Sequence, residues 1–136
     1  MSYVTEFPAA HPVEAAAHFR QRLACETDCA DVYASLQQPA PDFVLLHVVG
    51  SPEMYSRRHI PGAIHLRHID ITAKRMQEWP EDTVFVVYCA GPHCNGADRA
   101  ALKLAILGRP VKVMIGGSPA GKMKVLRFPH HDEFFS

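Results

Sequence analysis

Residues 84–108 read VFVVYCAGPHCNGADRAALKLAILG, and this segment is the most informative part of the chain. The apolar run that ends at Tyr88 is typical of a strand buried in a parallel sheet. A short loop rich in glycine, proline and asparagine follows Cys89. Residues 97–107 then predict a helix that ends at Gly108. The sequence therefore places a cysteine between the end of a strand and the start of a helix.

This position has consequences for the chemistry of Cys89. The first backbone N–H groups of a helix have no helical partner, and together with the helix dipole they favour anions. Such a field lowers the pKa of a cysteine from about 8.5 toward roughly 3.5–7.5. We therefore expect a Cys89 thiolate at neutral pH and take Cys89 as the candidate nucleophile. The alternative is that Cys89 is a small apolar residue at a strand end.

Length and composition limit the possible functions. A chain of 136 residues predicts one domain, and an apolar share of 48% suits a packed core. The net charge is zero with neutral histidines, so no basic face for nucleic acid is expected. We expect no membrane span and no secretory signal, because no long apolar run and no basic start are present. We thus expect a cytoplasmic protein with reduced cysteines.

The rest of the chain predicts an alternation of helices and strands. Asp28 is the predicted N-cap of one of the helices. In a parallel sheet with helices on both faces, ligands bind outside the carboxyl ends of the strands, where Cys89 is expected. Helices are predicted for residues 12–24, 29–37, 70–79 and 97–107, with a short one after Ser51, and strands for residues 43–49, 83–88 and 111–115, with a short one before Leu66.

Four segments resemble a rhodanese (sulfurtransferase) domain in their order and spacing. They are the strand 43–49 with Ser-Pro-Glu-Met-Tyr after it, the turn Arg-His-Ile-Pro-Gly-Ala-Ile at 58–64, the strand, loop and helix around Cys89, and the strand with paired glycines at 111–117. The turn is similar to the family's G-H-I-P-G-A, and the loop is similar to the C-x-G-P-x-C loop of a single-domain bacterial subgroup. The resemblance covers roughly residues 28–117.

The resemblance implies a three-layer α/β/α fold with a mostly parallel central sheet. It implies a domain over residues 28–136, with residues 1–27 as a helical leader packed on it. It further implies a monomer or homodimer that moves sulfane sulfur from a small anionic donor such as thiosulfate to a thiol or cyanide. A Cys89 persulfide would carry the sulfur, with no metal or cofactor. The residues expected to bind the substrate are Ala90, Gly91, Pro92, His93, Cys94, Asn95, Gly96, Ala97 and Arg99.

The roles of three of these residues stay open. Cys94 is either a resolving thiol that captures the persulfide and releases sulfide, or a residue of the loop wall. His93 binds substrate, or lowers the Cys89 pKa as a neighbouring cation, or is an exposed loop histidine. Arg99 either adds positive potential at the mouth of the site or lies on a solvated helix face.

Two departures from the family keep other functions open. His47 and Val49 stand where rhodanese domains usually carry aspartate and arginine, and the segment after Gly117 has no tryptophan. A degenerate domain that carries persulfide or binds a protein is therefore the alternative. A phosphatase or arsenate reductase is the further alternative. However, its C-x5-R loop needs arginine at the sixth position after the cysteine, where this chain has Asn95.

Overall fold

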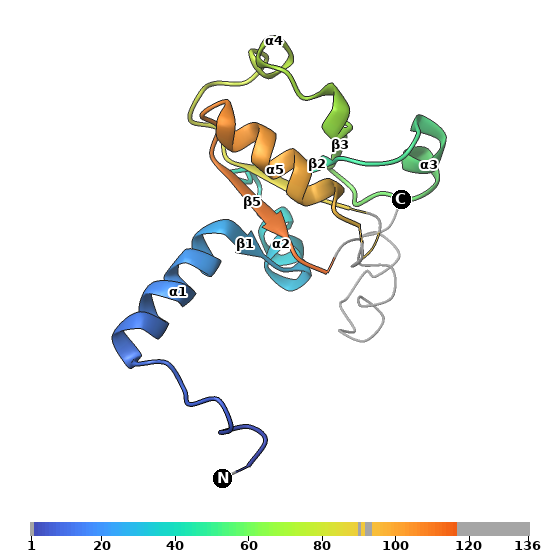
Figure 1. Ribbon diagram of the computed structural model, residues 1–136. Helices are drawn as coiled ribbons and strands as arrows, with labels where there is room; N and C mark the ends of the chain where they lie inside the picture. Colours follow the sequence, from blue (N-terminus) through green and yellow to red (C-terminus); the bar gives the residue numbers. More distant parts are fainter. Residues whose placement is uncertain (1, 90, 92–93, 117–136) are drawn as a thin grey trace.

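The computed structural model of the protein describes residues 2–89, 91 and 94–116. Its centre is a five-stranded sheet in the order β1-β5-β4-β2-β3, in which every pairing is parallel. This arrangement confirms the predicted α/β class (Figure 1). The strands are β1 (Glu26–Thr27), β2 (Val44–His47), β3 (Ile64–His65), β4 (Phe85–Tyr88) and β5 (Val111–Met114).

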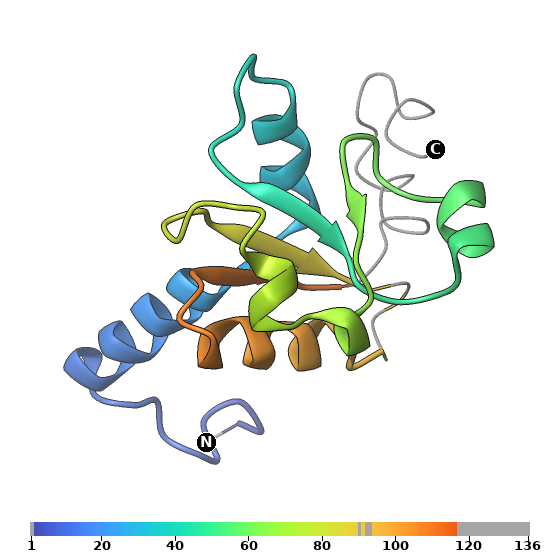
Figure 2. The same cartoon turned by 90° about the horizontal axis from the view of Figure 1, so that it is seen from above.

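Helices cover both faces of the sheet, so the fold has three layers (Figure 2). One face carries α2, and the opposite face carries α5 together with the segment around α4. The helices are α1 (Pro12–Cys25), α2 (Cys29–Leu36), α3 (Pro52–Arg57), the 3-10 helix η1 (His68–Asp70), α4 (Ala73–Met76) and α5 (Gly96–Ile106).

The two faces of the central strands bury alternate side chains, as a period of two requires. In β4, Val86 and Tyr88 pack with α2, whereas Phe85 and Val87 pack with α5. All four are buried, which explains why this strand reads as a continuous apolar run. Cys89 comes next in the chain and joins the α5 cluster.

Local signals in the sequence set several helix boundaries. The side chain of Asp28 accepts a hydrogen bond from the Asp31 N–H at 2.9 Å, which confirms the predicted N-cap of α2. Gly108 has φ of +79° after α5, as a residue that ends a helix often does. The predicted helix 70–79 is shorter in the structure, because Ile71 and Thr72 are extended and Thr72 caps α4 through its hydroxyl group.

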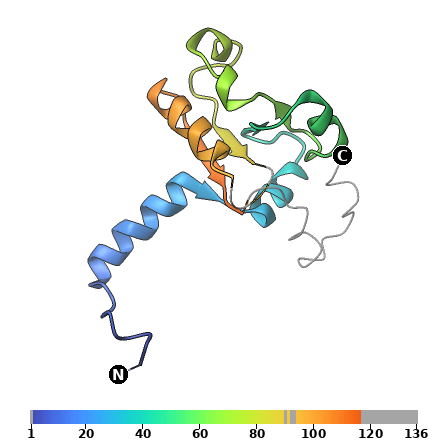
Figure 3. The ribbon, with the colours of Figure 1, turned by 45° about the vertical axis from the view of Figure 1, so that its right-hand side comes forward.

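The N-terminal helix contacts the sheet region through its last turns. Helix α1 has no buried residue, and its N-terminal end points away from the domain (Figure 3). Lys112 on β5 donates a hydrogen bond to the Leu23 carbonyl at 2.9 Å. Residues 26–27, which we expected in the leader, form the edge strand β1 instead. In the described part of the chain, no helix has the length and apolar character needed to cross a membrane.

Candidate active site

The candidate nucleophile Cys89 lies directly after β4, one of the central strands of the sheet, and faces the start of α5. Its side chain is buried, with 1% of the residue exposed. The Ala97 N–H in the first turn of α5 donates a hydrogen bond to the Cys89 Sγ at 2.9 Å. The Cys94 Sγ lies 2.7 Å from the Cys89 Sγ and accepts its S–H. The predicted meeting of strand end, helix N-terminus and thiol is therefore present.

Gly96 makes this close arrangement possible. A Cβ atom at Gly96 would lie 2.3 Å from a methyl group of Val49, 3.2 Å from the Cys89 Sγ and 3.4 Å from the Cys94 Sγ. The first contact is a steric clash with a short, branched side chain that has little freedom to move. The Gly96 N–H also donates to the Cys94 Sγ at 3.4 Å. Glycine is thus needed here for space and not for an unusual backbone angle.

The expectation of a Cys89 thiolate at neutral pH is wrong for this arrangement. Burial first, and then the hydrogen bond to Cys94, raise the pKa of the Cys89 thiol to about 12. The backbone N–H groups of Ala97 and Gly96 act in the opposite direction. The amides that favour an anion are therefore in place, but the loss of solvent outweighs them.

A cavity of about 200 Å³ opens beside the two sulfur atoms. A cavity of this volume suits a small inorganic ion. Its described lining combines the site loop with the end of β5 and comprises Cys89, Gly91, Cys94, Ala97, Asp98, Val113, Met114, Ile115 and Gly116. No arginine or lysine is among these described residues.

The predicted site residues divide into three groups. Gly91, Cys94 and Ala97 line the cavity with Cys89, and Gly96 packs against both sulfur atoms. Asn95 is exposed, and its carbonyl accepts the Arg99 N–H at 3.0 Å. Ala90, Pro92 and His93 lie outside the described residues, as does the segment after residue 116.

The charged residues at the site differ from what we expected. Arg99 is exposed and does not line the cavity, and its charge instead helps Lys103 to lower the pKa of His68, after the main effect of burial. Asp98, which our sequence analysis did not select, lines the cavity. The signal for Asp98 was its place beside Ala97 in the first turn of the helix, where a side chain can turn toward the loop.

His47 lies near the site, in surroundings that disfavour protonation of its ring. It ends β2, with only 6% of the residue exposed, and pairs in register with Tyr88 and His65. Rings of Tyr55, His65 and Tyr88 surround it edge-on, at 5.0–5.5 Å between centroids. Burial and the neighbouring His65 lower its pKa to about 4, so that His47 is neutral at neutral pH.

The histidine rings differ in their hydrogen bonds. The buried His47 Nδ1 has no partner among the described residues. His59 makes a structural hydrogen bond, since its Nδ1 lies 2.7 Å from the Tyr55 carbonyl oxygen. The described residues contain no cluster of three or more His, Cys, Asp or Glu side chains suited to a metal ion.

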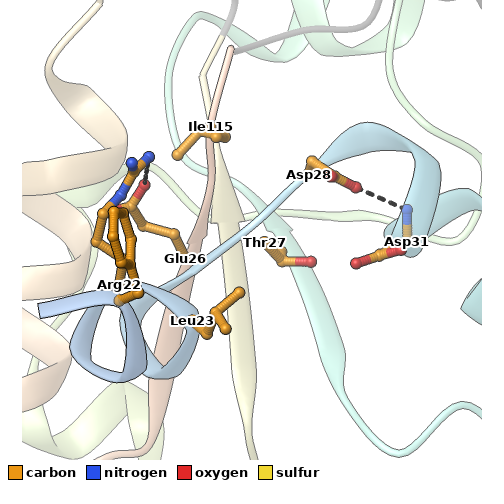
Figure 4. Close-up of a pocket in the computed structure, with 8 residues that line it drawn as sticks. Arg22, Leu23, Glu26, Thr27, Asp28, Asp31 and Ile115 are labelled. Atoms are coloured by element: carbon orange, nitrogen blue, oxygen red, sulfur yellow. Dashed lines mark hydrogen bonds and ion pairs between the residues drawn. The ribbon is translucent and has the colours of Figure 1, made fainter. Parts of the chain in front are cut away.

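A second cavity, of about 310 Å³, lies between the end of α1, the start of α2 and β5 (Figure 4). It contains the Arg22–Glu26 ion pair at 3.3 Å and the Asp28 cap of α2. Ile115 lines both this cavity and the cavity at Cys89, so the two are neighbours across one side chain.

The fold and the cysteine loop define a class, namely parallel α/β domains with a cysteine at the carboxyl edge of the sheet. The profile of the rhodanese-like domain family matches residues 28–124. The chain therefore belongs to the rhodanese-like domain family, whose domains are in general of the sulfurtransferase type. Among curated proteins, none matches this chain significantly.

Solved structures agree with this assignment. A protein from Bacillus halodurans is 36% identical, with a TM-score of 0.74, and the match covers 79% of this chain and 77% of that one. A full-length protein from Lactobacillus plantarum is 23% identical, with a TM-score of 0.68, over 88% and 97% of the two chains. A rhodanese-like domain from Anabaena, solved in solution, is 22% identical, with a TM-score of 0.61, over 76% of each chain. The last two support the fold alone.

Proposed function

We propose that the protein is a sulfurtransferase that moves sulfane sulfur from a donor such as thiosulfate to a thiol or cyanide acceptor. The main support is the position of the Cys89 Sγ, which accepts a hydrogen bond from the Ala97 N–H and lies beside a cavity that suits a small ion. The chain also belongs to the rhodanese-like family. Cys89 is the nucleophile and holds the sulfur as a persulfide between two half-reactions.

In the first half-reaction, the Cys89 sulfur attacks the outer sulfur of thiosulfate. A bond forms between the two sulfur atoms, and the S–S bond of thiosulfate breaks with its electron pair on sulfite. In the second half-reaction, cyanide or a thiolate attacks the outer sulfur of the persulfide and returns the Cys89 thiolate. The Ala97 N–H, already 2.9 Å from the sulfur, stabilises the negative charge in both steps.

The raised pKa of Cys89 slows the first half-reaction. Only a small fraction of a thiol with a pKa of about 12 is ionised at neutral pH, so the rate of attack depends on losing the S–H proton. Asp98 adds a carboxylate to the wall of the cavity, and it repels a dianionic donor. Both features predict slow turnover of thiosulfate at neutral pH.

The test is the release of sulfite from thiosulfate in a single turnover. The wild-type protein should release one sulfite per chain, and Cys89→Ser should release none. Cys25→Ser is the matched control, because Cys25 is an exposed cysteine at the end of α1 and takes no part in the site. Equal sulfite release by the wild type and Cys89→Ser would exclude Cys89 as the nucleophile.

A second candidate function is a persulfide carrier or protein-binding module, and the buried Cys89 thiol with its raised pKa favours it. A carrier would accept sulfur from another protein and show no single turnover with thiosulfate. A phosphatase or arsenate reductase fits less well, since Asn95 is exposed and no arginine is among the described residues that line the cavity.

A further inference from the structure

Two thiols, and not one, form the centre of this site. The Cys89 and Cys94 Sγ atoms lie 2.7 Å apart, and neither is in a disulfide. A disulfide bond is about 2.05 Å long, so a small movement of one side chain brings the two sulfur atoms into bonding distance. Cys89 is buried, whereas Cys94 is exposed on the loop side.

The surroundings of the pair keep it together. Gly96 leaves the space in which both sulfur atoms lie, since a Cβ there would come within 3.4 Å of each of them. The Gly96 N–H is directed at the Cys94 Sγ and the Ala97 N–H at the Cys89 Sγ. Two consecutive amides of the helix N-terminus thus face the pair of sulfur atoms.

We propose that Cys94 is a second catalytic residue, which cleaves the Cys89 persulfide and makes the protein a sulfide-releasing enzyme driven by a dithiol reductant. The proposal rests on the proposed function, because it needs the Cys89 persulfide as its substrate. The thiol that cleaves the persulfide then belongs to the protein itself, and the outer sulfur leaves as sulfide.

The step exchanges the S–S bond of the persulfide for a disulfide bond within the protein. The Cys94 sulfur attacks the Cys89 Sγ and forms the Cys89–Cys94 disulfide. The bond between the Cys89 Sγ and the outer sulfur breaks, and its electron pair leaves with that sulfur as hydrosulfide, which takes the proton of the Cys94 thiol. The outer sulfur is reduced and the two cysteines are oxidised. An external dithiol then reduces the disulfide by exchange and is itself oxidised to a disulfide.

The contact between the two sulfur atoms makes attack on the inner sulfur possible. The Cys94 Sγ lies 2.7 Å from the Cys89 Sγ, which is the atom that it attacks in this step. The cavity beside the pair offers room for the outer sulfur and for hydrosulfide to leave. Exposure of Cys94 gives a dithiol reductant access to the disulfide that forms.

The test is a single turnover with thiosulfate under anaerobic conditions, after removal of all reductant. Sulfite, sulfide and the mass of each cysteine peptide are measured, and a sample without thiosulfate serves as the blank. The wild type should release one sulfide for each sulfite and end two hydrogens lighter, with Cys89 linked to Cys94. Added dithiol should then restore a second turnover.

Cys94→Ser is the decisive variant, because serine keeps an acceptor for the Gly96 N–H. It should release sulfite, lose sulfide release, and accumulate a chain one sulfur atom heavier at Cys89. Cys94→Ala should behave alike, whereas Cys25→Ser should match the wild type. A merely structural role of Cys94 would not produce this gain of persulfide.

The remaining outcomes overturn the proposal in distinguishable ways. A stable persulfide on Cys89 in the wild type, with no sulfide, removes the role of Cys94 and leaves the proposed function standing. A persulfide found on Cys94 shows that Cys94 attacked the outer sulfur. Cys94 would then pass the sulfur on, and the protein would not release it as sulfide. No sulfite from either protein removes the proposed function and this inference with it.

Discussion

The burial of His47 predicts a specific loss of stability in acid. The pKa of His47 is lowered from 6.5 to about 4, first by burial and then by the nearby His65 and His59. Between these values the unfolded chain binds a proton that the folded protein does not bind. The stability due to neutral His47 is therefore complete above pH 6.5 and falls as the pH drops toward about 4.

The size of this effect follows from the same two values. One pKa unit is worth about 1.4 kcal/mol, so the loss at His47 reaches at most roughly 3 kcal/mol, and relaxation of the site lowers it toward about 1 kcal/mol. A neutral ring fits among the surrounding rings of Tyr55, His65 and Tyr88, so phenylalanine should fit in place of His47. His47→Phe should thus remove this part of the pH dependence.

The assay is urea unfolding, measured at a series of pH values from neutral to about pH 4. The free energy of unfolding of the wild type should fall more steeply than that of His47→Phe, with the curves separating below about pH 6.5. His18→Gln, at an exposed histidine of α1, should run parallel to the wild type. Parallel curves for the wild type and His47→Phe would refute the reasoning.

Three further predictions concern the site. Gly96→Ala should destabilise the fold by about 1–3 kcal/mol, because the new methyl group meets Val49 at 2.3 Å, and it should slow sulfite release; an unchanged unfolding midpoint would contradict this. Asp98→Asn should lower KM for thiosulfate by about two- to fivefold, since it removes a repelling carboxylate from the cavity wall, and unaltered steady-state kinetics would count against it. The rate of sulfite release should rise about tenfold per pH unit above neutral, as the Cys89 thiolate fraction grows below a pKa of about 12, whereas a flat profile in stopped-flow measurements would mean an ionised thiol.

The fold could be predicted from the sequence because its signals are local and mutually consistent. Buried strands such as β4 are continuous apolar runs, and Asp28 and Gly108 mark helix ends by their own chemistry. The edge strand β1 was not predicted, since its two residues pair with β5 only through the tertiary fold. The break at Ile71 and Thr72 was missed because the apolar spacing runs on across it.

The position of the candidate site could be predicted from the sequence, but the ionisation state of the Cys89 thiol could not. A strand end, a cysteine and a helix start follow one another in the chain, so the Ala97 N–H on the Cys89 sulfur could be foreseen. The degree of burial of that sulfur, and its contact with Cys94, depend on how the loop folds back. The sequence therefore showed the helix dipole that lowers the pKa, but not the loss of solvent that raises it.

The mechanism requires that Cys89 accepts sulfane sulfur, and the mass of the Cys94→Ser protein shows whether it does. After incubation with thiosulfate, that protein should be heavier by one sulfur atom, located on the peptide that contains Cys89 and removed by cyanide as thiocyanate. A Cys94→Ser protein of unchanged mass, folded as judged by its circular dichroism, would contradict the account.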